Sequence, residues 1–267
     1  MAKLLTDPGL CTGCGICAGL CPFGCMTLED GQPSAGEGCT LCGECVRGCP
    51  QGALVIRRQG TEEDTEGWEG IMVLLQQHNG NVHPVSYELA GQRGCKVHGL
   101  LIGEDAGRLV AEFSGCGLSG IYLFDHPFYR HFRADAYGEA ACRCIDALRP
   151  SVFLLGATPE GRSMAPFVSV AFSTGLTADC TALSLTPAGG LVQVRPAFGG
   201  NVMAQIVTPS ARPQMATVRY GVFEPVQPCR NGTPPKVIAC PLPPLRSRVQ
   251  VLEDLPLDEG RDITSAR

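Results

Sequence analysis

Apolar and polar residues follow one another in short blocks from residue 70 onward, and the blocks predict strands and helices in turn. Short continuous apolar runs such as VFLLGA indicate strands that are buried on both faces. The predicted strands are 71–77, 96–103, 120–125 and 151–158, and the predicted helices are 85–92, 104–115, 134–149 and 161–175. Because strands interleaved with helices are typical of a parallel sheet covered on both faces, the pattern predicts an α/β fold.

The alternation changes after Gly175, where glycine and proline separate short strand candidates. These candidates are 179–187, 190–197, 201–209 and 214–222. We expect them to extend the sheet in antiparallel fashion at one edge. The proline-rich segment from residue 226 onward holds two further strand candidates, 236–240 and 248–254, and is expected to form an extended arm.

The N-terminal segment is organised around cysteine instead. Two runs of four cysteines, each closed by proline, lie 28 residues apart: Cys11, Cys14, Cys17 and Cys21 before Pro22, and Cys39, Cys42, Cys45 and Cys49 before Pro50. This C-x2-C-x2-C-x3-C-P spacing is that of bacterial ferredoxins, which hold [4Fe–4S] clusters. Structural zinc usually takes two separated pairs of ligands, and a disulfide scaffold needs an oxidising compartment, so both alternatives are disfavoured.

In two-cluster ferredoxins the fourth cysteine of each run ligates the other cluster. This resemblance assigns Cys11, Cys14, Cys17 and Cys49 to cluster 1, and Cys39, Cys42, Cys45 and Cys21 to cluster 2. Four apolar residues are expected to shield the clusters: Ile16, Phe23, Val46 and Leu54. Cys25 occupies the place that Ala53 holds in the second run, so we expect a buried thiol near the cluster and not a ligand.

Composition narrows the class of protein. The chain has 267 residues, enough for two domains, and its net charge of −5 without a basic stripe argues against a nucleic-acid partner. No apolar run is long enough for a transmembrane segment, and the N-terminus does not fit a signal peptide. Sixteen cysteines without a secretion signal indicate a reducing compartment, so a cytoplasmic location is expected.

The remaining cysteines and two histidines carry no ligand pattern. The cysteines are expected to be small, mostly buried residues: Cys95, Cys116, Cys142, Cys144, Cys180, Cys229 and Cys240. His126 and His131 are expected to be loop or packing residues, because no cysteine or carboxylate cluster lies near them in the sequence.

Four segments then resemble a known family, in that family's order. They are LLGATPEGRSMAP (154–166), TGLTADCT (174–181), RPAFGGNVMAQI (195–206) and RPQMATVR (212–219). They closely resemble the N-terminal domain of the electron transfer flavoprotein alpha subunit, and the resemblance covers about 70–223. It implies a Rossmann-like, mostly parallel sheet of the adenine-nucleotide-hydrolase type and a beta subunit as partner. The added ferredoxin unit resembles alpha subunits of anaerobic acyl-CoA and lactate dehydrogenase systems, several of which bifurcate electrons.

The sequence departs from the family at three places. It ends at DEGRDITSAR, where the family continues into a C-terminal FAD-binding domain, so FAD is expected in the partner subunit or in that missing domain. The first helix is short, and Tyr220 stands where the family commonly has proline. The expected organisation is a ferredoxin domain (1–58), an acidic linker (59–69), the flavoprotein domain (70–225) and the arm (226–267).

Several residues of these motifs are candidates for contact with flavin or with the beta subunit: Thr174, Gly175, Thr177, Asp179, Arg195, Gly199 and Arg212. Arg195 and Arg212 each precede proline, which holds their backbone extended and can fix the guanidinium for a carboxylate or phosphate. The alternative for these arginines is an internal salt bridge. Asp179 is expected to cap or to pair with one of them, and Gly175 to cap the preceding helix.

The sequence therefore predicts an electron-transfer subunit that relays single electrons between [4Fe–4S] clusters and the flavin of an electron transfer flavoprotein heterodimer. Ferredoxin or an acyl-CoA or lactate-type dehydrogenase is the expected further partner. No acid–base pair or activated nucleophile is visible, so a carrier is favoured over an enzyme. The first alternative is a flavin-free iron–sulfur docking or sensing module. The second, an enzyme acting on a nucleotide, is disfavoured because no phosphate-binding loop is present.

Overall fold

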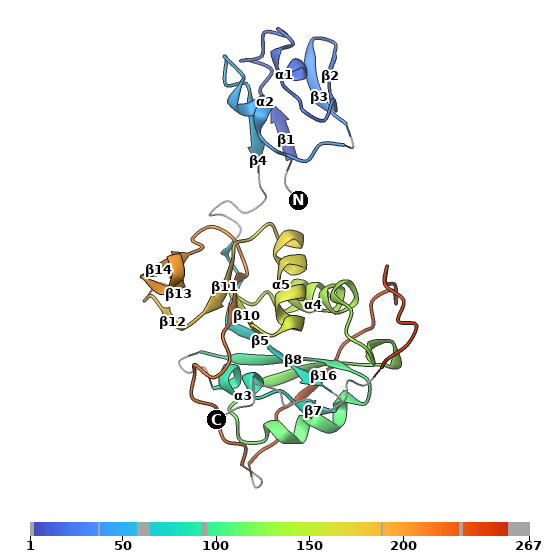
Figure 1. Cartoon of the computed structure of the whole chain (residues 1–267), viewed down its shortest axis with the longest axis vertical. Helices are drawn as coiled ribbons and strands as arrows, with labels where there is room; N and C mark the ends of the chain where they lie inside the picture. Colours follow the sequence, from blue (N-terminus) through green and yellow to red (C-terminus); the bar gives the residue numbers. More distant parts are fainter. Residues whose placement is uncertain are drawn as a thin grey trace.

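The computed structural model describes residues 3–36, 38–57, 65–78, 80–91, 95–187, 189–229 and 232–255. A small cysteine-rich unit covers 3–57, and a larger α/β unit follows from residue 65 (Figure 1). Residues 59–64 of the expected acidic linker and residues 256–267 of the expected arm lie outside the described residues.

The cysteine-rich unit repeats its architecture. Strand β1 (Lys3–Thr6) pairs antiparallel with β4 (Leu54–Arg57), and β2 (Met26–Glu29) pairs antiparallel with β3 (Gln32–Ala35). Two one-turn helices, α1 (Ile16–Gly19) and α2 (Glu44–Arg47), each begin after a left-handed glycine, Gly15 with φ 77° and Gly43 with φ 82°. A side chain at these positions would meet the steric cost that glycine avoids, so each cysteine loop needs the glycine that directly precedes its helix.

The core of this unit is very small. Its buried members are two repeat-related pairs, Cys17 with Cys45 and Met26 with Leu54. Burying an apolar side chain contributes about 1.5–3 kcal/mol, whereas ordering the backbone costs about 1–2 kcal/mol per residue. Such a core is too small to hold a unit of this length by itself, and the metal ligation expected from the cysteine runs would add folding free energy.

The α/β unit is built on a seven-stranded sheet whose neighbouring strands are all parallel. The strand order is β11 (Leu176–Cys180), β15 (Gln214–Val218), β10 (Val152–Gly156), β5 (Ile71–Leu75), β8 (Val97–Gly103), β9 (Gly120–Asp125) and β16 (Val237–Ala239). The predicted α/β class is confirmed. A short hairpin, β6 (Gln77–His78) and β7 (Asn81–Val82), follows β5.

Helices cover both faces of this sheet (Figure 1). Helices α4 (Ala134–Leu148) and α5 (Pro159–Ala171) pack on one face, and α3 (Val85–Ala90) with the 3-10 helix η2 (Ala106–Phe113) packs on the other. Successive side chains of a strand point to opposite faces, so Met72 and Leu74 join the α4–α5 core while Val73 and Leu75 join the α3–η2 core. The helix expected at 104–115 is shorter in the structure, where Ala106–Phe113 form a 3-10 helix.

The expectation of an antiparallel extension of the main sheet was wrong. Strands β11 and β15 run parallel to β10, and β15 lies between β11 and β10. The intervening strands β12 (Ala182–Leu185), β13 (Leu191–Ala197) and β14 (Val202–Val207) form a separate antiparallel sheet. This excursion carries the chain away from the main sheet and returns it beside β10, where the fully buried QMATV run fits an interior strand.

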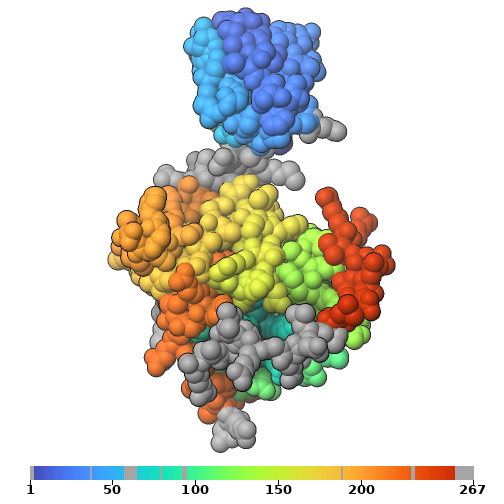
Figure 2. All heavy atoms as spheres, viewed as in Figure 1, coloured from blue at the N-terminus to red at the C-terminus, as the bar shows by residue number. Residues whose placement is uncertain are grey.

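The C-terminal segment also differs from expectation. Residues 236–240 do supply a strand, β16, but 248–254 form none. They lie instead against the start of α4, where the Asp135 carboxylate accepts hydrogen bonds from Ser247 Oγ (2.9 Å) and from the Arg248 backbone N–H (2.7 Å). Figure 2 shows this segment running over the α4 side of the molecule. Within the described residues, no helix has the length and apolar content needed to cross a bilayer.

Candidate iron–sulfur centres and motif residues

Two cavities of the small unit are lined by cysteines. The first is lined by Cys11, Cys14 and Cys17 of the first run together with Cys49 of the second. The second is lined by Cys39, Cys42 and Cys45 of the second run together with Cys21 of the first. The fold therefore groups the thiols as the crossed assignment groups them, three from one run and the fourth from the other. The ligation itself stays a prediction.

The thiol arrangement fits a cluster better than a single ion. In the described part of the chain, no three cysteine, histidine or acidic side chains converge closely enough to hold one metal ion. Zinc would require that convergence, because its Zn–S bonds are only about 2.3 Å long. A [4Fe–4S] cluster spreads its four ligand positions over four irons, and thiolates are its usual ligands. Thiols that surround a cavity without converging on one point suit this second case.

Backbone N–H groups favour the thiolate form of the fourth cysteine in each run. Those of Cys25 and Phe23 lower the pKa of Cys21, and those of Ala53 and Gln51 lower the pKa of Cys49. The donor residues of the two runs correspond to one another in the 28-residue repeat, Cys25 to Ala53 and Phe23 to Gln51. Burial raises the pKa of Cys17 and Cys45 instead, and ligation by iron would have to overcome this cost.

Cys25 lines the second cavity together with the four cysteines expected at cluster 2. Its Sγ atom lies 3.5 Å from that of Cys21, and its side chain is half-buried. The neighbouring Cys21 thiol and burial raise the pKa of Cys25 to about 11. The repeat-related Ala53 is buried in the wall of the first cavity and brings no thiol. The two cavities therefore differ by one sulfur atom.

The expected shielding residues do not all line the cavities. Ile16 and Leu54 line the first cavity and Phe23 lines the second. Val46 packs against the small core instead. Ile16 and Phe23 remain exposed, so each combines contact with a cavity wall and contact with solvent.

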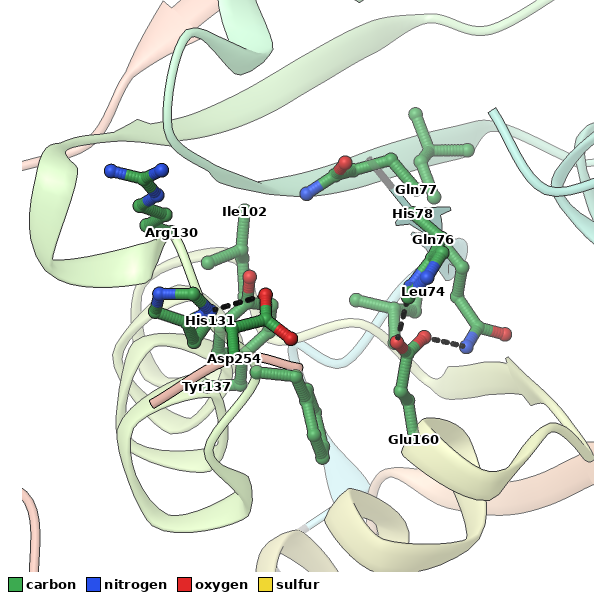
Figure 3. A pocket seen from close by; sticks show the side chains of 12 residues that line it. Leu74, Gln76, Gln77, His78, Ile102, Arg130, His131, Tyr137, Glu160 and Asp254 are labelled. Atoms are coloured by element: carbon green, nitrogen blue, oxygen red, sulfur yellow. Dashed lines mark hydrogen bonds and ion pairs between the residues drawn. The ribbon is translucent and has the colours of Figure 1, made fainter. Parts of the chain in front are cut away.

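A separate pocket lies at the carboxyl end of the parallel sheet, where β10 returns to the opposite side of β5 (Figure 3). Open α/β sheets bind ligands at such a switch point. Gln76 donates through Nε2 to Thr158 Oγ1 (2.5 Å) and to Glu160 Oε2 (3.4 Å), while Glu160 also faces His78 Nδ1 at 3.7 Å. On the other wall of the pocket, His131 Nδ1 lies 3.6 Å from Asp254 Oδ2.

This pocket does not suit a dinucleotide. Its volume is about 180 Å³, below the ~300–1,000 Å³ of typical ligand pockets. Glu160 also sits in the first turn of α5, where a phosphate would otherwise use the free backbone N–H groups. A carboxylate already present there would repel a phosphate. The geometry therefore gives no support to an enzyme acting on a nucleotide.

Four of the seven candidate motif residues lie at the ends of β11 and β15, at opposite edges of the sheet. Thr174, Gly175 and Arg212 lie at the amino ends of β11 and β15. Thr174 Oγ1 donates to the Pro213 carbonyl at 2.8 Å, and Arg212 Nη1 donates to the backbone carbonyls of its own loop, at 2.9 Å for Ala211. The expected cap at Gly175 is wrong, because α5 ends earlier, with its cap at Phe172.

Asp179 lies at the carboxyl ends of the same strands. It sits in a bulge of β11 with a left-handed backbone (φ 61°), and its N–H donates to Thr217 Oγ1 at 3.0 Å. Its carboxylate accepts from Arg219 at 2.5 and 3.2 Å and from Arg162 at 3.3 Å. The expected pairing with Arg195 or Arg212 is therefore replaced by two other arginines.

The Asp179 carboxyl has a pKa below its usual range, first because of Arg219 and then because of Arg162 and Arg195. Arg195 thus acts on this carboxylate through its charge, while Arg162 and Arg219 contact it directly. Arg219 closes the RPQMATVR motif and Arg162 lies in GATPEGR, so both stood in the family segments without being singled out. Their convergence depends on β11 and β15 being neighbours, which local sequence does not reveal.

The last two motif residues lie apart from both groups. Thr177 is buried in β11. Gly199 (φ 70°) lies in the exposed turn Phe198–Gly200 between β13 and β14, beside a Phe198 side chain that is 84% exposed. The structure therefore does not assemble the seven candidates into one site.

The other cysteines follow expectation in part. Cys116, Cys144 and Cys180 are buried and Cys142 and Cys240 are half-buried. The expectation was wrong for Cys95 and Cys229, which are exposed. His126 acts as a loop residue, because its Nδ1 accepts a hydrogen bond from the Phe128 N–H at 3.0 Å.

Comparison with known proteins agrees with the division of the chain into a small cysteine-rich unit and a larger α/β unit. Residues 71–244 match the model of the electron transfer flavoprotein domain, and residues 10–54 match that of the 4Fe-4S dicluster domain. A protein of Acetobacterium woodii named lactate dehydrogenase (NAD(+),ferredoxin) subunit LctC is 35% identical over 93% of this chain and 62% of its own length. An electron transfer flavoprotein subunit alpha of Megasphaera elsdenii is 40% identical over 60% of this chain and 50% of its own. The chain thus spans between half and two thirds of these relatives.

Proposed function

The chain belongs to the electron transfer flavoprotein family and carries a 4Fe-4S dicluster domain, and from this premise we propose that it relays single electrons between two [4Fe–4S] clusters and a flavin bound in a heterodimer. The single observation that carries the proposal is the grouping of eight cysteines around two cavities in one chain with a flavoprotein-type sheet. When bound, the clusters would supply one-electron chemistry at potentials set by their surroundings.

The protein's own residues would position these cofactors. Cys11, Cys14, Cys17 and Cys49 would hold cluster 1, and Cys39, Cys42, Cys45 and Cys21 would hold cluster 2. Backbone N–H groups directed at Cys21 and Cys49 favour the thiolate in each set. The half-exposed Ile16 and Phe23 limit water at the cavity mouths while leaving a surface from which electrons can be exchanged.

At the carboxyl edge of the sheet, Arg162 and Arg219 share the Asp179 carboxylate and therefore leave excess positive charge, to which Arg195 adds through its effect on the pKa of Asp179. A guanidinium group can contact a flavin phosphate or a carboxylate of a partner subunit. We place the contact with flavin or with a beta-type subunit at this group, Arg162, Arg195 and Arg219. The group at the amino edge is less suited, because Arg212 already donates to its own loop.

The name of the Acetobacterium woodii relative links lactate dehydrogenase with NAD⁺ and ferredoxin, and another relative, from Anaerotignum propionicum, is named acryloyl-CoA reductase electron transfer subunit beta and is 32% identical over 191 residues. We propose a dehydrogenase system of this kind as the setting, with ferredoxin or the dehydrogenase as the exchange partner. Bifurcation in such a system is part of the same proposal.

The test is co-expression with a beta-type electron transfer flavoprotein subunit, followed by anaerobic purification and stepwise reduction in the presence of FAD. We expect co-purification of both subunits, and cluster and flavin absorbance that bleach in one coupled titration. A stable chain that binds neither the beta subunit nor FAD would contradict the relay and would favour the docking or sensing module.

A further inference from the structure

Two cysteines of the α/β unit, Cys144 and Cys240, meet between helix α4 and the last strand of the main sheet. Cys144 lies on the buried face of α4 and is only 3% exposed. Cys240 directly follows β16, and it packs against the buried core to which Cys144 belongs. The two thiols lie within hydrogen-bonding reach of each other. They form a pair that neither cysteine run of the small unit includes.

The register of the sheet explains why Cys240 is directed toward α4. Ile238 of β16 pairs with Tyr122 of β9, and side chains along a strand alternate between the two faces of the sheet. Tyr122 packs with the core under α4, so Ile238 and Cys240 belong to that same face. The Cys240 N–H donates to the Leu123 carbonyl at 2.9 Å, which continues the pairing with β9 and fixes the backbone at Cys240.

The two thiols differ in their surroundings. Cys144 Sγ lies 3.6 Å from Met72 Sδ inside the core, and the Cys240 thiol together with burial raises the pKa of Cys144. The same contact lowers the pKa of Cys240, because an S–H group donated by Cys144 stabilises a neighbouring thiolate. Cys240 is half-buried, whereas Cys144 is buried. Since the thiolate is the reactive form of cysteine, Cys240 is the thiol that a reagent from solvent attacks or meets first.

From this geometry we propose that Cys144 and Cys240 are a modification site, a thiol pair that a small disulfide such as oxidised glutathione converts to a protein disulfide. The Cys240 thiolate attacks one sulfur of the reagent, so that a mixed disulfide forms and one glutathione thiolate leaves. Cys144 then gives its proton to solvent and attacks Cys240 Sγ, and the second glutathione thiolate leaves. Two cysteine thiols are oxidised, and one reagent disulfide is reduced to two thiols. The inference goes beyond the proposed electron relay and needs neither cluster.

The disulfide would join α4 to the segment that follows β16. Residues 241–255 form neither a helix nor a strand. They are held at the start of α4 by the bonds of Ser247 and Arg248 to Asp135. A covalent bond between Cys240 and α4 adds a second fixed point at the other end of this segment, and its reduction removes that point again.

The test exposes the full chain, purified without oxygen, to oxidised glutathione. Alkylation of the remaining thiols and mass spectrometry of the peptides then map each disulfide. We expect a peptide that links Cys144 to Cys240, and its loss after treatment with dithiothreitol. Cys142→Ala is the matched control on α4, because a residue two positions away points in another direction, and it should keep the link. Cys144→Ala should stop at the mixed disulfide on Cys240.

The unaltered chain is the decisive sample, so a variant that misfolds does not affect the outcome. The proposal is overturned if the unaltered chain gives no link between Cys144 and Cys240, or if glutathione stays on Cys240 although Cys144 is present. Trypsin cleavage after Arg246 and Arg248 measures how firmly the segment is held. We expect slower cleavage in the oxidised chain than in the reduced chain, and equal rates would contradict the second fixed point.

Discussion

Asp179 balances the charge of the arginine group at the carboxyl edge of the sheet. Its side chain is 24% exposed, and it is the shared partner of Arg162 and Arg219. Its left-handed backbone is one that aspartate and asparagine tolerate better than most residues. Replacement by asparagine therefore removes the charge while keeping the local conformation and one hydrogen-bond acceptor.

We expect Asp179→Asn to lower the free energy of unfolding by about 1 kcal/mol at pH 7, as for partly exposed ion pairs. The folded-state pKa of Asp179 is lowered, so its stabilisation is present above the unfolded pKa, about 3.9, and is lost as pH falls through the folded value. Urea unfolding followed by circular dichroism should show the difference between the two proteins begin to shrink near pH 4 and vanish once the pH is below the folded-state pKa. Asp146→Asn, which removes an exposed carboxylate on α4, is the matched control. A difference that persists in acid would contradict the ion-pair assignment.

The start of α5 shows how one side chain joins an element to the sheet. Thr158 caps the helix, since its Oγ1 accepts from the Gly161 N–H at 3.1 Å, and it also accepts from Gln76 Nε2 at the end of β5. Gln76 is almost fully buried. Loss of the hydroxyl would therefore leave both a helix N–H and a buried amide with one partner fewer.

We expect Thr158→Ala to lower the free energy of unfolding by about 1–2 kcal/mol, because losing a cap costs ~0.5–2 kcal/mol and the buried amide adds to this. Thr158→Ser keeps the hydroxyl and should cost much less. Chemical unfolding of the three proteins measures the difference. Equal losses in the alanine and serine variants would show that the methyl group, and not the cap, is responsible.

The elements that the sequence predicted well are those whose signal is local. A few neighbouring residues are enough to indicate a buried strand at β5 and at β10. The same holds for the cysteine spacing, which indicates a cluster-binding loop. The neighbours of β15 in the sheet could not be predicted from local sequence. They depend on where the chain re-enters the main sheet after β12–β14. The same long-range fact decides that Asp179 meets Arg219 and not Arg195, although all three stand in recognised motifs.

At the scale of the whole molecule, the two units have different sources of stability. Among the described residues, the α/β unit has cores of 20 and 18 buried residues, whereas the core of the small unit has 4, and two of those are cysteines expected to ligate the clusters. Cores of the first kind hold a sheet without cofactors. The small unit has no comparable apolar core to hold it once its thiols are free, since two of its four buried core residues, Cys17 and Cys45, are themselves cavity-lining cysteines.

Removing iron should therefore unfold one unit and spare the other. We expect that anaerobic treatment of the full chain with a chelator makes residues 3–57 accessible to a protease while the sheet stays protected. The reason is that metal ligation would contribute to the folding free energy of the small unit only. Limited proteolysis with mass spectrometry of the fragments measures this, with the untreated chain as the control for both units. Cuts in the sheet that rise together with those in 3–57 would show that the units unfold cooperatively. A small unit that stays protected without iron would show instead that its side-chain packing suffices, against the size of its core.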